Sequence, residues 1–266
     1  ASNVVGTLTV VQSTVLSSEL SVGGNVTVTG NETVAGTLSV AGQTTVDSLA
    51  VISGGVLNQT LSVGGNTTLT GNETVQGTLS VAGAVNMVNT LNVVRSVTLS
   101  SQLSVGAGLT VTGNETVSGT LSVYGSVTGD AITGTNVTIN SELSVGTNLT
   151  VSGFETVSGT LSVAGQTTLG AVTVTGAGVL NQTLSVAGNA AVTGNETVSG
   201  TLSVNGVIVG AATLSVNGVA VMNSDLTVGR ALTVVGATAM SGTLSVNGAS
   251  NVVGTLTVVQ STVLSS

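Results

Sequence analysis

Five regularly spaced glutamates are the residues of this 266-residue chain that could bind a metal ion or a proton within the fold. Each lies in a tetrapeptide N/F-E-T-V, and they recur every 40 to 42 residues. If their side chains point into a core, each carboxyl needs a raised pKa, a hydrogen-bond partner or a cation such as calcium. If Asn-Glu instead opens a corner of the fold, the carboxylates are solvated, and the sequence favours this interpretation. The candidate metal ligands are Glu32, Glu73, Glu115, Glu155 and Glu196.

The rest of the composition contains few of the side chains that enzymes use for catalysis. The chain has no Cys and no His, and its only basic side chains are those of Arg95 and Arg230. Nucleophilic and acid–base catalysis need a positioned base. The recurring carboxylates are too far apart in sequence to form an evident pair, and the glycines follow no phosphate-binding pattern. We therefore predict that the chain has no catalytic or cofactor-binding residues and is not an enzyme.

A six-residue block, x-Leu-x-Val-x-Gly, accounts for almost the whole chain, and Thr37–Gly42 is one example. Apolar residues two apart are typical of a β-strand, and the small closing residue provides a bend. Because one block is too short to be stable alone, the blocks must stack. The pattern predicts an all-β, extended three-sided β-solenoid with Val and Leu inside. The predicted core includes Val22, Val28, Val34, Leu38, Val40, Val75, Leu79, Val81, Val117, Leu121, Val123, Val157, Leu161 and Val163.

Two longer periods lie above the block. Residues 1–18 return unchanged as residues 249–266, so the full repeat is 248 residues. We expect residues 1–266 to form one continuous solenoid array, taken from a longer tandem protein or a continuous filament. Six super-repeats of seven blocks start at Glu19, Thr60, Gln102, Glu142, Thr183 and Asp225.

Some super-repeats are one or two residues short of seven full blocks. The missing residues fall in the blocks from Gln43 and Gln166 and in the stretch 126–135, which we predict to be corners that absorb deletions. The pattern also weakens at 207–212. Six super-repeats of seven blocks make 42 blocks, or 14 complete three-sided coils. This arithmetic favours a single-chain solenoid over an intertwined homotrimer.

Two resemblances support a solenoid. The aliphatic fourth position and the small closing residue resemble the hexapeptide rule of left-handed, three-sided β-helices. The phrase LTVTGNETVSGTLSV, Leu109–Val123, also resembles shaft repeats of phage and viral tail fibres. This second resemblance implies three intertwined chains, in which three copies of each glutamate meet at one level and can chelate an ion. The chain departs from the hexapeptide acyltransferases because it has no His for their catalysis.

Charge and motifs restrict the partners. Ten acidic residues against two basic ones give a net charge of −8, so nucleic acids and anionic membrane surfaces are poor partners. No run of 18 apolar residues predicts a membrane span. Ten N-x-S/T sequons occur. We favour Asn ladders at turns as their explanation, with N-glycans as the alternative.

The preferred functional expectation is mechanical. We expect the shaft of an extracellular filament or fibre, at a cell surface or on a virion, that self-associates end to end or as a homotrimer. The alternative is an adhesin or a phage-like receptor-binding tail fibre whose specificity lies in a tip outside this sequence. A third interpretation is an ice-binding solenoid with outward rows such as Thr27/Thr29. Asn, Gln, Glu and Ala interrupt these rows, which argues against ice binding.

Overall fold

The computed structural model describes residues 1–210 and 212–264, which form strands and turns without a helix. Consequently, no helix in this part of the chain is long and apolar enough to cross a membrane. Ala211, from the weak stretch 207–212, lies outside the described residues. So do Ser265 and Ser266 at the end of the repeated segment.

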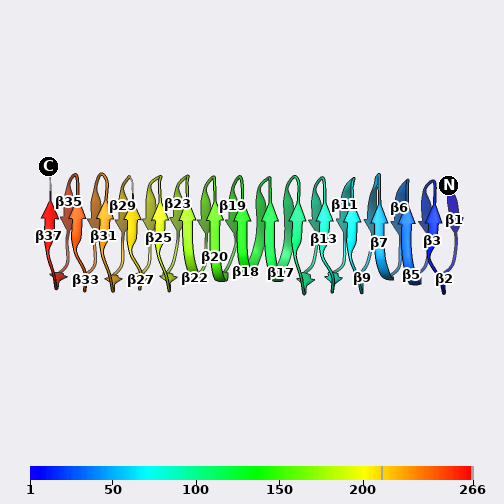
Figure 1. Cartoon of the computed structure of the whole chain (residues 1–266), viewed down its shortest axis with the longest axis horizontal. Helices are drawn as coiled ribbons and strands as arrows, with labels where there is room; N and C mark the ends of the chain where they lie inside the picture. The colour runs from blue at the N-terminus through cyan, green and yellow to red at the C-terminus, as the bar shows by residue number, and fades with distance from the viewer. Residues whose placement is uncertain (211, 265–266) are drawn as a thin grey trace. The chain divides into compact units, whose positions relative to one another are not determined.

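The chain divides into two compact units, Ala1–Gly134 and Thr135–Ser266, called here the N-terminal and C-terminal units. In each unit, consecutive coils stack in parallel and form a β-solenoid, and Figure 1 shows their strands side by side. The boundary between the units lies inside β18 (Val127–Ile139).

The other strands of the N-terminal unit are short, with a few long exceptions. They are β1 (Ser2–Val4), β2 (Leu8–Val10), β3 (Thr14–Leu16), β4 (Leu20–Val22), β5 (Val26–Val34), β6 (Thr37–Val40), β7 (Thr44–Val51), β8 (Gly54–Leu57), β9 (Leu61–Val63), β10 (Thr67–Leu69), β11 (Asn72–Val75), β12 (Leu79–Val81), β13 (Val85–Met87), β14 (Leu91–Val93), β15 (Val97–Leu99), β16 (Leu103–Val105) and β17 (Leu109–Val123).

The C-terminal unit continues the same design. Its strands are β19 (Leu143–Val145), β20 (Leu149–Val157), β21 (Leu161–Val163), β22 (Thr167–Val174), β23 (Gly178–Leu180), β24 (Leu184–Val186), β25 (Ala190–Val192), β26 (Glu196–Val198), β27 (Leu202–Val204), β28 (Ile208–Gly210), β29 (Leu214–Val216), β30 (Ala220–Met222), β31 (Leu226–Val228), β32 (Leu232–Val234), β33 (Thr238–Met240), β34 (Leu244–Val246), β35 (Ser250–Val252), β36 (Leu256–Val258) and β37 (Thr262–Leu264).

Each strand pairs in parallel with the strand one coil later, which is usually three blocks further along the chain. In the N-terminal unit Leu61 pairs with Leu79, and in the C-terminal unit Leu184 pairs with Leu202. Because three blocks separate the paired strands, each coil has three sides and a single chain completes it. The predicted three-sided, single-chain β-solenoid is confirmed.

Side-chain alternation places the second and fourth positions of each block inside. In β6, Leu38 and Val40 are buried, whereas Thr37 and Ser39 are exposed. Burying one such aliphatic side chain stabilises the fold by about 1.5–3 kcal/mol. Every side chain that the sequence assigned to the core is buried: Val22, Val28, Val34, Leu38, Val40, Val75, Leu79, Val81, Val117, Leu121, Val123, Val157, Leu161 and Val163.

Two of the predicted deletions fall between two sides of a coil. In the pairing of β5 with β7, the register shifts after Val28, and Asn31 pairs with Ser48, one residue short of three full blocks. In the C-terminal unit, β20 and β22 show the same shift between Val151 and Phe154. The strands run on across these shifts, because losing one residue at a bend leaves the inward alternation of both sides intact.

Asparagines at the bends connect successive coils. The Asn25 Oδ1 accepts a hydrogen bond of 2.9 Å from the backbone N–H of Gln43, one coil later. Asn66 does the same for Ala84, also at 2.9 Å. These ladders satisfy N–H groups that the bend removes from the strand pairing, which gives the sequon asparagines a structural role. Asn72, Asn136, Asn148 and Asn195 are further sequon residues with such bonds.

Candidate functional site

The five recurrent glutamates point into the coils. Their exposed fractions are 1% for Glu32, Glu115 and Glu155, 2% for Glu73 and 6% for Glu196. The interpretation that the sequence favoured, with these carboxylates solvated at corners, is wrong. The backbone makes no corner at N-E-T-V: β11, for example, is a regular strand that pairs on both sides. The second and fourth positions therefore both face inward.

Each glutamate of the N-terminal unit belongs to a different side of the solenoid. Second-position residues stack, one per coil, into three inward columns that we call A, B and C. Column A contains Leu20, Leu38, Gly55, Glu73, Leu91 and Leu109. Column B contains Val26, Thr44, Leu61, Leu79, Val97 and Glu115. Column C contains Thr14, Glu32, Leu49, Thr67, Val85, Leu103 and Leu121.

This distribution follows from the length of the super-repeat. Seven blocks are two complete coils of three blocks plus one further side. Within each unit, each N-E-T-V block therefore lies on the side that follows the side of the previous N-E-T-V block. In the C-terminal unit, Glu155 stacks with Val172, and Glu196 stacks with Gly178 and Leu214. These two columns are again different.

Gly55 makes the space that the Glu73 carboxyl occupies. A Cβ atom at Gly55 would lie 2.7 Å from Oε1 and 2.9 Å from Cδ of Glu73, and closer still to Oε2. Glycine thus replaces the Leu usual in column A one coil before the acid. Gly178 holds the same position relative to Glu196, with a looser fit of 3.6 Å to Cγ. Neither glycine was identified from the sequence, although counting back one coil, or three blocks, from each acid finds both.

The interior offers no compensation for a charge at four of these positions. Neither carboxyl oxygen of Glu32, Glu73, Glu115 or Glu155 has a hydrogen-bond partner in the described chain. Burial raises the pKa of Glu32 and Glu196 from an ordinary 4.5 to about 7. Burial also raises the pKa of Glu73, Glu115 and Glu155 to about 8. Desolvation is the cause, because water stabilises the charged form and the apolar interior does not. The carboxyls are therefore neutral acids in mildly acidic solution.

The arrangement does not fit a calcium site. Calcium takes six to eight oxygen ligands, whereas Glu73 is stacked between Gly55 and Leu91. The described residues contain no group of three or more His, Cys, Asp or Glu side chains that could hold a metal ion. The five candidate metal ligands are thus five separate buried acids, and we derive no metal chemistry from them.

Buried threonines form a second set of inward polar groups. Their hydroxyl oxygens have no hydrogen-bond partner in the described chain. Thr238 occupies the place that glutamate holds in the other super-repeats. It stacks between Ala220 and Leu256, in an inward column of the C-terminal unit that contains neither Glu155 nor Glu196. The set comprises Thr44, Thr67, Thr167 and Thr238.

One outward surface of the N-terminal unit carries an unbroken row of hydroxyls. It lies on the outside of the strands that carry column B, and we call it the hydroxyl row. Interruptions of the kind expected from the sequence occur in the corresponding rows on the other two sides, at Asn92 on one side and at Ala50 and Asn86 on the other. The hydroxyl row consists of Thr9, Thr27, Thr45, Ser62, Ser80, Thr98 and Thr116.

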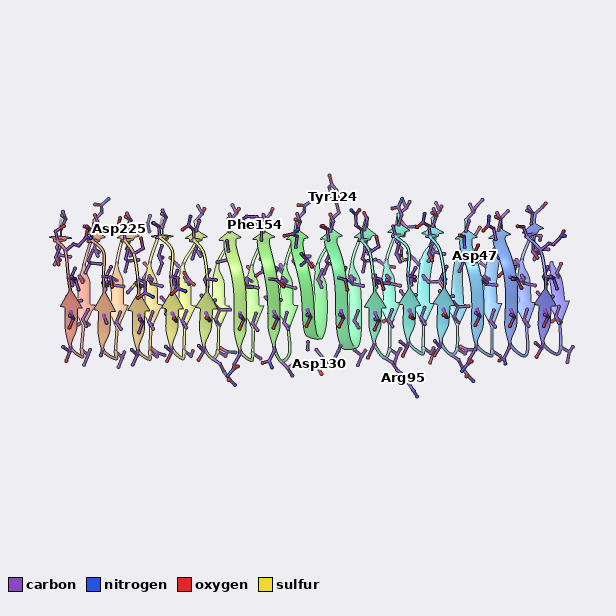
Figure 2. All side chains as sticks on the ribbon, turned by 60° about the horizontal axis from the view of Figure 1, so that its bottom comes forward. Asp47, Arg95, Tyr124, Asp130, Phe154 and Asp225 are labelled. Atoms are coloured by element: carbon purple, nitrogen blue, oxygen red, sulfur yellow. The ribbon has the colours of Figure 1, made fainter. Side chains whose placement is uncertain are left out.

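Large and charged departures from the repeat lie on the outside. Tyr124 and Phe154 are 72% and 71% exposed, and Figure 2 shows Tyr124 and Arg95 pointing away from their coils. A shallow hollow beside Phe154 is lined mainly by Gly153, Gly170 and other small residues. Among the described residues, the hollow beside Phe154 brings no charged side chains together. Arg95 lies at a separate hollow on the outside of the N-terminal unit, which the polar side chains of Gln43, Asn58, Gln59, Thr60 and Gln76 also line.

The fold and its interior define a β-solenoid with regularly spaced buried acids. No known protein family, characterised protein or solved structure matches this chain. Its function must therefore be argued from its own residues.

Proposed function

We propose that this chain is a non-catalytic structural protein, the shaft of an extracellular filament or fibre built from tandem 248-residue repeats. The observation that carries the proposal is the parallel register between successive coils within each unit. Each coil adds a similar set of backbone hydrogen bonds and a similar aliphatic stack. The length of such a shaft is then set by the number of repeats, as in other solenoids.

Composition supports a structural rather than a catalytic role. The chain has no His or Cys, and no Lys accompanies its two Arg residues. The five acids within the coils are separated from one another and closed off from solvent. An acid–base catalyst needs its group within hydrogen-bond reach of a substrate, which these positions do not offer.

Tandem copies of the repeat test the proposal. We would express one, two and three copies of the 248-residue repeat and measure particle lengths by electron microscopy. With coils about 4.8 Å apart, 14 coils should add about 67 Å per repeat. Compact particles, or lengths that do not grow with copy number, would refute the shaft. Saturable binding to cell surfaces by the full-length protein, but not by these repeats alone, would favour the adhesin alternative, because its specificity lies in a tip outside this sequence.

The hydroxyl row supports ice binding as a second candidate. Its hydroxyls recur once per coil, about every 4.8 Å, and no other residue type interrupts them between Thr9 and Thr116. Thermal hysteresis of the purified chain tests this candidate. Thr45→Lys should abolish hysteresis, whereas the matched variant Asn92→Lys, on the outside of column A, should not. Absence of hysteresis in the unmodified chain rejects this second function.

A further inference from the structure

The buried carboxyls have no counter-charge within the coils. Their stacking neighbours are Gly, Thr, Leu and Val, as in Gly55 and Leu91 around Glu73 or Thr14 and Leu49 around Glu32. Every other charged side chain of the described residues is exposed: Glu19, Asp47, Arg95, Asp130, Glu142, Asp225 and Arg230. The phenol of Tyr124 is exposed as well. Ionisation of an inward glutamate thus creates an anion that no described cation faces.

Such an anion is incompatible with the closed coil. Removing a charge from water without pairing it carries a large free-energy cost, and a group in this position either stays neutral or regains solvent. Glu73 cannot reach solvent by a rotamer change alone, because β11 is paired on both sides and the carboxyl points at Gly55. Solvation requires the strand to separate from a neighbouring coil.

We propose that the solenoid is a proton-dependent fold: coils that contain the inward glutamates stay closed only while their carboxyls are protonated, and alkaline solution opens them locally and reversibly. This proposal does not rest on the proposed shaft function. According to this proposal, the strands of the five N/F-E-T-V blocks are the first to separate from their neighbouring coils as the pH rises.

The sign of the pH dependence follows from burial. The pKa of each inward carboxyl is higher in the folded chain than in the unfolded chain. The folded state therefore binds more protons, and stability falls as pH rises. Stability is complete below about pH 4.5, decreases through the folded pKa values of about 7 to 8, and is constant above them. Within this window each carboxyl changes the unfolding equilibrium constant by up to about tenfold per pH unit.

Opening should be local because the acids are distributed. Within each unit, successive glutamates are separated by about two and one-third coils, or roughly 11 Å along the axis, and lie on different sides. Between Glu32 and Glu73, one coil has Gly55, Leu61 and Thr67 at its three inward second positions and carries no acid there. Repeat structures open in units of neighbouring coils. The N/F-E-T-V blocks should accordingly lose amide protection before the intervening T-L-S-V blocks.

Amide hydrogen exchange of the unmodified chain between pH 5 and 9, corrected for intrinsic exchange rates, tests the proposal. The comparison is a variant with Glu32, Glu73, Glu115, Glu155 and Glu196 all changed to Gln. The unmodified chain should lose protection at the five blocks between pH 6 and 9 and regain it on return to pH 5. The five-site variant should show no such loss. The matched control changes the exposed Glu19 and Glu142 to Gln, and it should behave like the unmodified chain.

A second variant and a direct titration cover the case in which the Gln variant does not fold. If the Gln variant does not fold, the same five positions are changed to Leu, the residue of the T-L-S-V blocks. In addition, ¹³C-labelled Glu in the unmodified chain should show five carboxyls that titrate well above the ordinary 4.5. Protection that is independent of pH, a loss of protection that survives in the Leu variant, or a spectrum without these five raised titrations would each overturn the proposal.

Discussion

Gly55→Ala is the substitution that tests the interior packing most directly. The added methyl would lie 2.7 Å from Oε1 and 2.9 Å from Cδ of Glu73, and real Cβ atoms essentially never approach below 3.0 Å. The carboxyl cannot retreat along column A because Leu91 stacks on its other side. Overpacking a core costs about 1–3 kcal/mol, whereas Gly→Ala at an unstrained position gains about 0.4–1 kcal/mol. We expect a net loss of about 1–2 kcal/mol.

A double-mutant cycle assigns this loss to the carboxyl. The free energy of unfolding would be measured by denaturant titration with circular dichroism at pH 5.5, where the carboxyls are protonated. In a Glu73→Ala background, Gly55→Ala should cost nothing or stabilise, because the atoms it strikes are gone. The coupling free energy should be about 1–3 kcal/mol, the upper part of the range for residues in contact.

Gly178→Ala is the matched control. It occupies the same place relative to Glu196, but its new methyl would meet Cγ at 3.6 Å, an ordinary contact. It should be neutral or slightly stabilising. Backbone strain does not confuse the comparison, because the only described residue with a left-handed φ is the neighbouring Gly54, at 124°. Equal losses at Gly55 and Gly178, or a Gly55 loss that persists without the Glu73 carboxyl, would refute the reasoning.

Two further substitutions probe the polar groups of the coil. Asn66→Ala removes the acceptor of the Ala84 N–H and should lower the free energy of unfolding by about 0.5–1.5 kcal/mol in the same denaturant titration. The control Asn217→Ala, at an exposed bend, should change this free energy by less than about 0.5 kcal/mol. Thr238→Val replaces a buried, unpartnered hydroxyl with a methyl. It should raise the melting temperature, since burying such a hydroxyl lowers the stability of the fold by about 1–3 kcal/mol. No increase would mean that the hydroxyl is solvated or paired.

The three-sided coil was predictable from the sequence because Val, Leu and Gly repeat at fixed positions of a six-residue block, whereas the preference for one chain over three came from the number of blocks. An aliphatic residue at the fourth position of each block, as in Val22 and Val40, is buried when the blocks form the sides of a stacked coil. For a single chain the three-block register then follows, since three sides close a coil. The deletions near Gln43 and Gln166 were also predictable as places between sides, because only there can a residue be lost without reversing the inward face.

The direction of the glutamates was mispredicted for a physical reason. The sequence argument weighed an ionised carboxylate, whose burial is prohibitive, against a solvated corner. The relevant comparison is between the free-energy cost of burying a neutral carboxylic acid and the cost of losing the strand pairing on both sides of β11. Burying a neutral polar group costs about 1–3 kcal/mol, whereas exposing Val75 and breaking several backbone hydrogen bonds costs more. Nothing in one N-E-T-V block reveals which comparison applies.

The seven-block super-repeat has a consequence for how the acids are tolerated. If the acids recurred in every coil, their carboxyls would stack about 4.8 Å apart on one side, and one ionisation would oppose the next. If they recurred in every second coil, all would still weaken the same side. Seven blocks move each acid to a new side, as in columns C, A and B for Glu32, Glu73 and Glu115. Between one acid and the next, the side that carries it is lined by residues such as Leu91 and Leu109. An opened strand therefore always has intact coils above and below on which to close again, which is the condition for an opening that is local and reversible.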